Sequence, residues 1–224
     1  MNAFAPVRAL RQVGTIMLVA LIAGCSALVP KAAPQPSFYL LQIMPADKPA
    51  HGTAVATATL PTLVVDAPRA AAGLDGTHLL YVREAHRLEY FAHSEWVDTP
   101  AHMLAPLIVG TLERHAAFAA VVSAPSTAAG DLRLETEILL LQQEFGAGAS
   151  RAHFVLRAYV VDQATHAVLA RRDLDRSIAA DSEDARGGVV AANRAVQAVL
   201  DDLAGMCGDA ARNWRPATDA RRGR

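Results

Sequence analysis

Three consecutive segments in the second half of the chain alternate between apolar and polar residues. Between residues 132 and 141, apolar side chains at every second position are separated by charged ones such as Arg133 and Glu135. The alternation recurs over residues 152–160, and apolar positions continue along residues 168–178. A period of two residues is typical of strands that bury one face. Short polar connections separate the three segments, which predicts an antiparallel meander.

Shorter apolar segments with strand-like composition precede and follow a first helix. Each is bounded by glycine, proline or polar residues that favour turns. The four residues 83–86, between two of these segments, are expected to form a hairpin turn. The segments expected to be strands are residues 37–43, 63–65, 79–82, 87–96 and 119–122.

Two helices are predicted, one between the strands and one after the meander. The first begins at Pro100, since proline suits the first helical position, and Pro106 is expected to kink it. The second spans residues 182–206, where valine and alanine recur on one face. Gly187 and Gly188 are expected to weaken its first turns by about 1 kcal/mol per glycine relative to alanine.

The order of strands and helices predicts the fold class. Helices segregated from an antiparallel meander are typical of α+β domains. We therefore expect a single domain with a mostly antiparallel or mixed β-sheet and two α-helices packed on one face, which suits a chain of 224 residues. With a formal net charge of −1, the chain has no basic field that would attract nucleic acid.

The N-terminal segment has the three parts of a secretory signal. Arg8 and Arg11 precede an apolar stretch over residues 13–23, which is too short to span a bilayer, and Gly24 and Cys25 follow. The sequence Ile-Ala-Gly-Cys resembles a bacterial lipobox, in which the cysteine is lipidated and becomes the mature N-terminus. We therefore expect cleavage between Gly24 and Cys25 and a lipid anchor on Cys25. The alternative is a buried apolar helix that ends in cysteine.

The residues after Cys25 predict which membrane carries the protein and how the folded domain is connected to the lipid anchor. Lipoproteins of this kind commonly stay at the inner membrane when aspartate follows the cysteine, so Ser26 favours the outer membrane. The next residues are rich in proline and alanine and are expected to form an extended tether. The predicted organisation is a signal peptide over residues 1–24, an anchor and tether over 25–36, a folded domain over 37–207 and a disordered polar tail over 208–224.

The sequence carries no recognisable motif for catalysis, metal binding or cofactor binding. It lacks a Gly-x-Ser-x-Gly elbow, a phosphate-binding loop and a dinucleotide fingerprint. Its eight histidines are scattered, without the spacing of a zinc site. Cys207 has no partner once Cys25 is lipidated, and we expect it to be half-buried at a helix end. We predict no enzyme activity, no catalytic residues, no metal site and no cofactor.

Four residues are candidates for contacts with a partner protein. Trp96 and Tyr90 lie in the predicted strand over residues 87–96, and tryptophan is favoured at interface hot spots. The alternative for Trp96 is a position in the core where the strand meets the helix. Arg172 and Arg176 belong to a mixed-charge strand face, for which the alternative is simple solvation.

Several aromatic and charged landmarks resemble one bacterial family. They are Phe38-Tyr39-Leu40-Leu41, Leu79 with Tyr81, the stretch from Leu88 to Trp96 that leads into the Pro100 helix, Leu134 to Ile138, Phe145, and Ala191 to Ala195. Together with the lipobox, they resemble the ABC-type transport auxiliary lipoprotein family, which includes the intermembrane transport lipoproteins of paraquat-inducible type. The resemblance covers roughly residues 37–206.

The resemblance implies a function without catalysis. Such proteins are not known as enzymes. They belong to transport systems with a cytoplasmic ATPase, a permease and a mammalian-cell-entry (MCE) domain protein, which are associated with lipid movement between the two membranes. We expect a periplasmic, lipid-anchored adaptor that binds the MCE component at the outer membrane, and the resemblance also allows a homo-oligomer. The alternatives are a lipid-binding periplasmic carrier and an envelope hydrolase with an unrecognised site.

Overall fold

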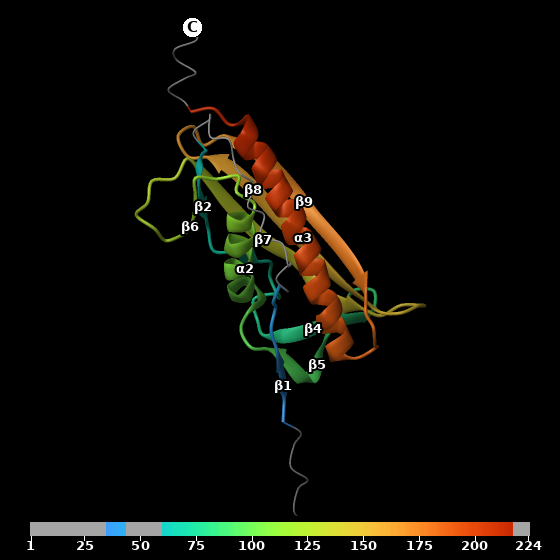
Figure 1. Cartoon of the computed structure of the whole chain (residues 1–224). Coiled ribbons are helices and arrows are strands. Elements are labelled where there is room, and N and C mark those ends of the chain that lie inside the picture. The colour runs from blue at the N-terminus through green and yellow to red at the C-terminus, as the bar shows by residue number, and fades with distance from the viewer. Residues whose placement is uncertain (1–34, 44–59, 217–224) are drawn as a thin grey trace, which may run out of the picture. The chain divides into compact units, whose positions relative to one another are not determined.

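A mixed β-sheet carries two helices on one of its faces (Figure 1). The structure is a computed structural model, and it describes residues 35–43 and 60–216. Within these residues the sheet has nine strands, and the expected α+β class is confirmed. In chain order the elements are β1 (Ser37–Tyr39), β2 (Thr62–Val65), β3 (Arg69–Ala70), β4 (His78–Glu84), β5 (Arg87–Trp96), α2 (Pro100–Arg114), β6 (Ala120–Ser123), β7 (Leu132–Glu144), β8 (Arg151–Asp162), β9 (Val168–Ala179) and α3 (Ala185–Asn213).

Three long strands form the antiparallel meander that the sequence predicts. β7 pairs with β8, and β8 pairs with β9, in antiparallel register over almost their whole length. Leu134 lies opposite Val160, and Leu156 lies opposite Leu174, so the apolar positions of the three strands share one face. This face is buried in the core, whereas the opposite face carries the charged positions.

The other edge of β7 is lined by parallel strands, which the alternation of residues does not predict. β2, β3 and β4 pair with β7 one after another, from its N-terminal to its C-terminal end. β6 and β5 extend the sheet beyond β2 and β4, and β1 adds to β5 in parallel. β1, β4 and β5 therefore lie together at the end of the sheet where β7 finishes (Figure 1).

The two helices bury the apolar face of the sheet. α2 is capped by Thr99, whose side chain accepts a hydrogen bond from the His102 N–H, and it runs as one element with Pro106 inside it. Leu104 and Ile108 are fully buried and extend from α2 into the core. α3 contributes a longer buried stripe, which includes Val189, Val196, Val199, Leu200 and Leu203.

A pair of buried glycines lets the first turn of α3 approach the rest of the domain. A Cβ on Gly187 would overlap the backbone of Ser182, and one on Gly188 would overlap the side-chain amide of Gln143. That amide is itself held in place, because it donates to Ser150 Oγ at 2.8 Å. The glycine pair, expected only to weaken the helix, is therefore required for this close contact.

Helix α3 is longer than the sequence predicts. It continues to Asn213, so the expected helix end and the expected disordered tail are wrong for residues 208–213. The reason is that Ala210 and Ala211 extend the buried stripe with side chains too small to give a clear periodic signal. The last residues, 217–224, lie outside the described part of the chain.

A carboxylate joins the end of α3 to a distant turn. The Trp214 indole donates to Asp162 Oδ2 at 2.7 Å, and the Thr165 N–H and hydroxyl donate to Asp162 Oδ1 at 2.8 and 2.9 Å. Burial raises the pKa of the Asp162 carboxyl, but these hydrogen bonds outweigh burial and hold the pKa below its usual value. The end of the helix is thereby tied to the β8–β9 turn.

Cys207 lies inside the core rather than at a helix end. Its side chain is 0% exposed, and burial raises its pKa to about 12. The expected half-buried position is wrong, because the helix continues to Asn213 and carries Cys207 on its buried side. A neutral thiol shielded from solvent is unreactive.

Candidate interaction surfaces

The structure does not bring the four expected partner-binding residues together. Trp96 is 3% exposed and belongs to the core, as the alternative interpretation expects, so it offers no surface to a partner. Tyr90 is 58% exposed on β5. Arg172 and Arg176 lie on β9, which pairs with β8 and not with β5.

β9 forms an edge of the sheet. Among the described strands it pairs only with β8, so its other edge has backbone N–H and C=O groups available to a further strand. Val168 and Leu169 are exposed at its start. Mixed charges follow from Arg171 to Arg176, and charges on an edge strand protect it against unspecific pairing.

A hollow beside Arg172 lies between β9 and the second half of α3. Its volume is about 230 Å³. Arg176, in contrast, forms an ion pair with Asp202 of α3, so its charge is used within the domain. Arg172 is therefore the better placed of the two arginines to meet a partner. The lining of the hollow includes Leu169, Ala170, Arg172, Met206 and Trp214.

Two clusters of charged side chains connect neighbouring strands on the outer face of the meander. Arg157 Nε and Nη2 donate to the two carboxylate oxygens of Asp173 at 2.9 Å each. Nearer the start of β8, the His153 ring lies between Glu144 and Asp175, with Nδ1 and Nε2 each 2.9 Å from a carboxylate oxygen. These contacts join β7, β8 and β9, so the clusters have a structural role.

The His153 cluster predicts that stability falls as the pH rises. Burial lowers the pKa of His153, but the hydrogen bonds and charges of Glu144 and Asp175 outweigh burial and raise the pKa above its usual value. The stabilisation is complete below the unfolded-state pKa of about 6.5 and is lost as the pH rises through the folded-state pKa. We expect a lower free energy of unfolding, measured by urea titration, at about pH 8.5 than at about pH 5.5. This difference should shrink in His153→Gln, and an equal difference in both proteins would contradict the role of His153.

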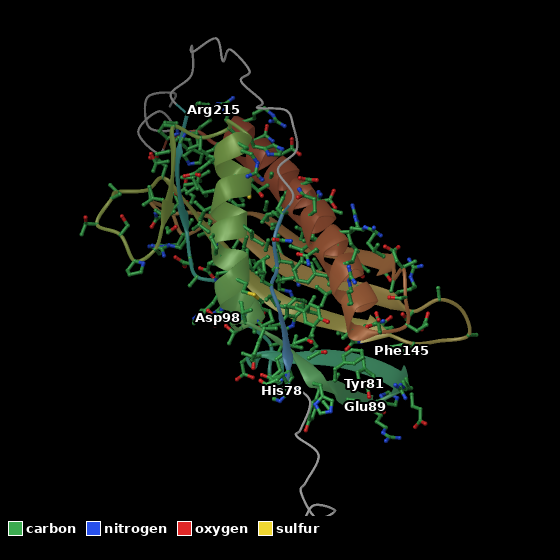
Figure 2. The ribbon with its side chains drawn as sticks, turned by 60° about the horizontal axis from the view of Figure 1, so that its bottom comes forward. His78, Tyr81, Glu89, Asp98, Phe145 and Arg215 are labelled. Carbon is green, nitrogen blue, oxygen red and sulfur yellow. The ribbon has the colours of Figure 1, made fainter. Side chains whose placement is uncertain are left out.

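Aromatic side chains contact one another on one side of the β4–β5 hairpin, where Tyr81 and Glu89 lie near Phe145 (Figure 2). Tyr81 contacts the rings of Phe91 and Phe145, with centroid distances of 4.7 and 5.6 Å. The Tyr81 hydroxyl donates to Glu89 Oε2 at 2.8 Å, and this hydrogen bond raises the pKa of Tyr81. Arg83 lies over the Tyr81 and Phe145 rings. On the opposite side of the hairpin, Leu88 and Tyr90 are 52% and 58% exposed.

The enclosed spaces of the described domain are small. Two of them are lined by Trp96, and each has a volume of about 20 Å³, which is close to the room that one water molecule needs. A larger hollow of about 730 Å³ lies on the outer side of α3, where Arg194 and Asp201 are exposed. Within the residues that the structure describes, no group of three acidic, histidine or cysteine side chains is arranged to hold a metal ion. None of the described helices combines the length and apolar character needed to cross a bilayer.

Comparison with known proteins identifies the family. The family model for ABC-type transport auxiliary lipoprotein components matches residues 39–204. The chain belongs to the ABC-type transport auxiliary lipoprotein family. The resemblance found in the sequence is thereby confirmed. The expected signal peptide, cleavage residue Gly24 and lipidation residue Cys25 precede the match and lie outside the described residues, as does the expected tether up to residue 34.

Two solved structures share the fold of this auxiliary lipoprotein. A Xanthomonas campestris protein assigned to the DUF330 family is 19% identical with a TM-score of 0.67, and the match covers 79% of this chain and 97% of that one. An uncharacterized protein is 12% identical with a TM-score of 0.60, and that match covers 77% of this chain and 98% of the other. At these identities the likeness shows the fold alone. A search of curated proteins found no match.

Proposed function

We propose that this auxiliary lipoprotein is a non-catalytic adaptor, anchored by lipid on Cys25, that binds an MCE-domain protein of an ABC transport system with its permease and ATPase. The family match over residues 39–204 carries the proposal. The lipobox-like sequence ending at Cys25 supports the anchor, and Ser26 favours the outer membrane. In this role the domain connects the envelope bilayer to a system that moves lipid between the two membranes.

The interior of the domain supports an adaptor rather than a lipid carrier. An enclosed space of about 20 Å³ has room for one water molecule, whereas an acyl chain of many methylene groups needs far more. A chain in the larger hollow on α3 would lie at the surface beside the charged Arg194 and Asp201. The charged clusters around Arg157 and His153 make contacts between strands, which fits a hydrolase poorly.

The free edge of β9 is the surface that best fits an extended segment of the partner. It combines backbone groups that pair with no strand among the described residues, the exposed Val168 and Leu169, and the hollow beside Arg172. A partner strand would continue the sheet through backbone hydrogen bonds, while one of its side chains entered the hollow. A carboxylate on that side chain would pair with the Arg172 guanidinium, because Asp209, which also lines the hollow, already pairs with Arg212.

Co-purification in mild detergent tests the adaptor role. We expect the MCE-domain protein to be retained by the wild-type lipoprotein. Arg172→Glu should lower the affinity for this partner about tenfold, which corresponds to about 1.4 kcal/mol. Arg186→Glu is the matched control, because Arg186 is exposed on the first turn of α3, near the other end of the sheet.

Two outcomes of this experiment would have different meanings. Failure of the wild-type protein to retain any MCE-domain protein would overturn the adaptor role. Equal retention by wild type, Arg172→Glu and Arg186→Glu would reject the edge of β9 as the docking surface. A carrier would be indicated instead if native mass spectrometry of the folded domain showed a bound lipid besides the one on Cys25.

A further inference from the structure

Exposed apolar side chains gather at the end of the domain where β1 enters the sheet. In the part of the chain that the structure describes, nine large hydrophobic side chains are exposed, and five of them lie on β1, on β5 or directly after these strands. Phe38, at 61%, has the highest exposed fraction of the nine. We name this set the β1–β5 patch, and its members are Phe38, Leu40, Leu88, Tyr90 and Val97.

β1 has one side chain toward the core and Phe38 on the opposite side. Tyr39 lies beside the buried Trp96 in the β1–β5 register and packs against the core. Successive side chains of a strand point to opposite faces, so Phe38 faces away from the core. Leu40, directly after the strand, is also exposed. Val97 follows Trp96, donates its N–H to the Tyr39 carbonyl and is exposed beside them.

The β4–β5 hairpin continues this outward surface. Leu88 and Tyr90 lie opposite Val82 and Leu80, so these four side chains share the side of the hairpin that faces away from Tyr81. The Tyr90 ring also lies 4.6 Å from the ring of His78, at the end of β4 nearest the β1–β5 pair. The apolar surface is therefore shared by three neighbouring strands.

The distance to the proposed anchor identifies a bilayer as the occupant of the patch. Eleven residues separate Cys25 from Ser37, the first residue of β1. Even when fully extended, eleven residues span at most about 40 Å. A lipid on Cys25 therefore keeps β1 within about 40 Å of the membrane, and the patch lies on β1 itself and on the strand paired with it.

The chemistry of the patch also suits a bilayer. Tyrosine is enriched at the membrane–water interface, and phenylalanine and leucine are typical of surfaces buried at the boundary of headgroups and acyl chains. The nearby Arg87 pairs with Glu84 and Glu89, and Glu95 lies opposite Phe38, so the charged groups beside the patch have no net positive charge. Binding through the patch should therefore rest on its apolar side chains and should not be strengthened by anionic lipid.

We propose that the β1–β5 patch rests in the headgroup region of the bilayer that holds the lipid anchor. The domain then stands on the membrane in one orientation instead of moving freely on its tether. This inference rests on the proposed anchor at Cys25. In this orientation the β4–β5 end of the domain lies at the membrane. The Arg172 hollow, near the opposite end of β9, lies away from the membrane.

Nitroxide labels on introduced cysteines test this contact. Leu88→Cys is compared with Leu169→Cys, since Leu169 is a matched exposed leucine at the far end of the meander. The native thiols do not compete for the label, because Cys207 is buried and Cys25 carries lipid in the proposed form. The full-length lipidated protein is reconstituted into vesicles of phosphatidylethanolamine and phosphatidylglycerol. Electron paramagnetic resonance then measures how often oxygen and a water-soluble nickel complex collide with each label.

The expected result is preferential access of oxygen to the patch, since oxygen partitions into lipid and the nickel complex does not. The oxygen-to-nickel ratio should be about fivefold higher or more at position 88 than at position 169, as for a side chain buried at the acyl boundary. Equal ratios at the two positions would overturn the proposal. Shielding of position 88 from both reagents would also overturn it, because a protein surface and not lipid would then cover the patch.

Failure of the anchor can be recognised separately from failure of the contact. The intact mass of the mature protein reports whether Cys25 carries lipid. The same labels are then measured on Cys25→Ser protein that is held on chelating lipid by an N-terminal histidine tag. A high ratio at position 88 on this support, with no lipid on the native protein, would reject the anchor and uphold the contact. A low oxygen-to-nickel ratio at position 88, with lipid present on Cys25, would uphold the anchor and reject the contact.

Discussion

Replacing Cys25 with serine is expected to move the protein from the membrane fraction to the soluble fraction. Serine has no thiol to receive acyl chains, and each methylene group buried in lipid contributes about 0.8 kcal/mol. One acyl chain holds a protein on a bilayer only marginally, whereas several chains hold it almost permanently. The ratio of membrane-bound to soluble protein should therefore fall by about a hundredfold or more.

The measurement requires that the signal peptide be removed from the variant. In Cys25→Ser, a cleavable signal from a protein that is not lipidated replaces residues 1–24, so that an uncut signal cannot act as the anchor. Membrane and soluble fractions are separated by ultracentrifugation and compared by immunoblotting. Cys207→Ala is the matched control, because that thiol lies in the core and its loss should not change the distribution. A processed serine variant that still sediments with membranes would contradict the lipid anchor.

Gly187→Ala is expected to destabilise the domain by about 3 kcal/mol, the cost of overpacking a site that cannot relax. The added Cβ would overlap the backbone of Ser182, which cannot rotate away as a side chain can. The Gly187 N–H also donates to Asp184 Oδ1 at 2.8 Å and thereby caps α3. A shift of the helix that relieved the overlap would therefore weaken its N-terminal cap.

Gly205→Ala provides the matched control for this substitution. Gly205 is exposed on the same helix, and no atom lies within 4 Å of an added Cβ. Alanine is favoured over glycine inside a helix by about 1 kcal/mol, so this variant should be slightly more stable than the wild type. Denaturant titration of both proteins measures the two effects. The same change in stability for both variants would show that close contact at the start of α3 does not matter.

Elements with one wholly buried face could be predicted from the sequence. Buried and more exposed residues alternate along β7 and β8, because every second side chain lies in the core. Both helices place a recurring apolar stripe against the sheet. The parallel pairing of β2, β3 and β4 with β7 could not be predicted in this way. These strands are short and distant from β7 in the chain, so their register is decided by tertiary contacts that no local pattern reveals.

The candidate site shows why strand periodicity fails at an irregular position. Trp96 and Tyr90 are an even number of residues apart on β5, and a regular strand would place both side chains on one face. The register between β4 and β5 is irregular between His78 and Leu80, and the two side chains face opposite sides. Trp96 is therefore buried while Tyr90 is exposed. The roles of Arg172 and Arg176 depend on where α3 packs, which the sequence of β9 does not reveal. Arg176 pairs with Asp202 of α3, whereas Arg172 borders the hollow.

The length of β9 gives the proposed arrangement a fixed height. The strand has twelve residues, or about 40 Å at the usual rise per residue. Its last residues are in register with the strands that border the β4–β5 end, and its first residues border the hollow at Arg172. The length of the meander then sets the distance between the bilayer and a docked partner. A longer tether would not change the distance between the bilayer and the docking edge of β9, because the strands alone set that distance.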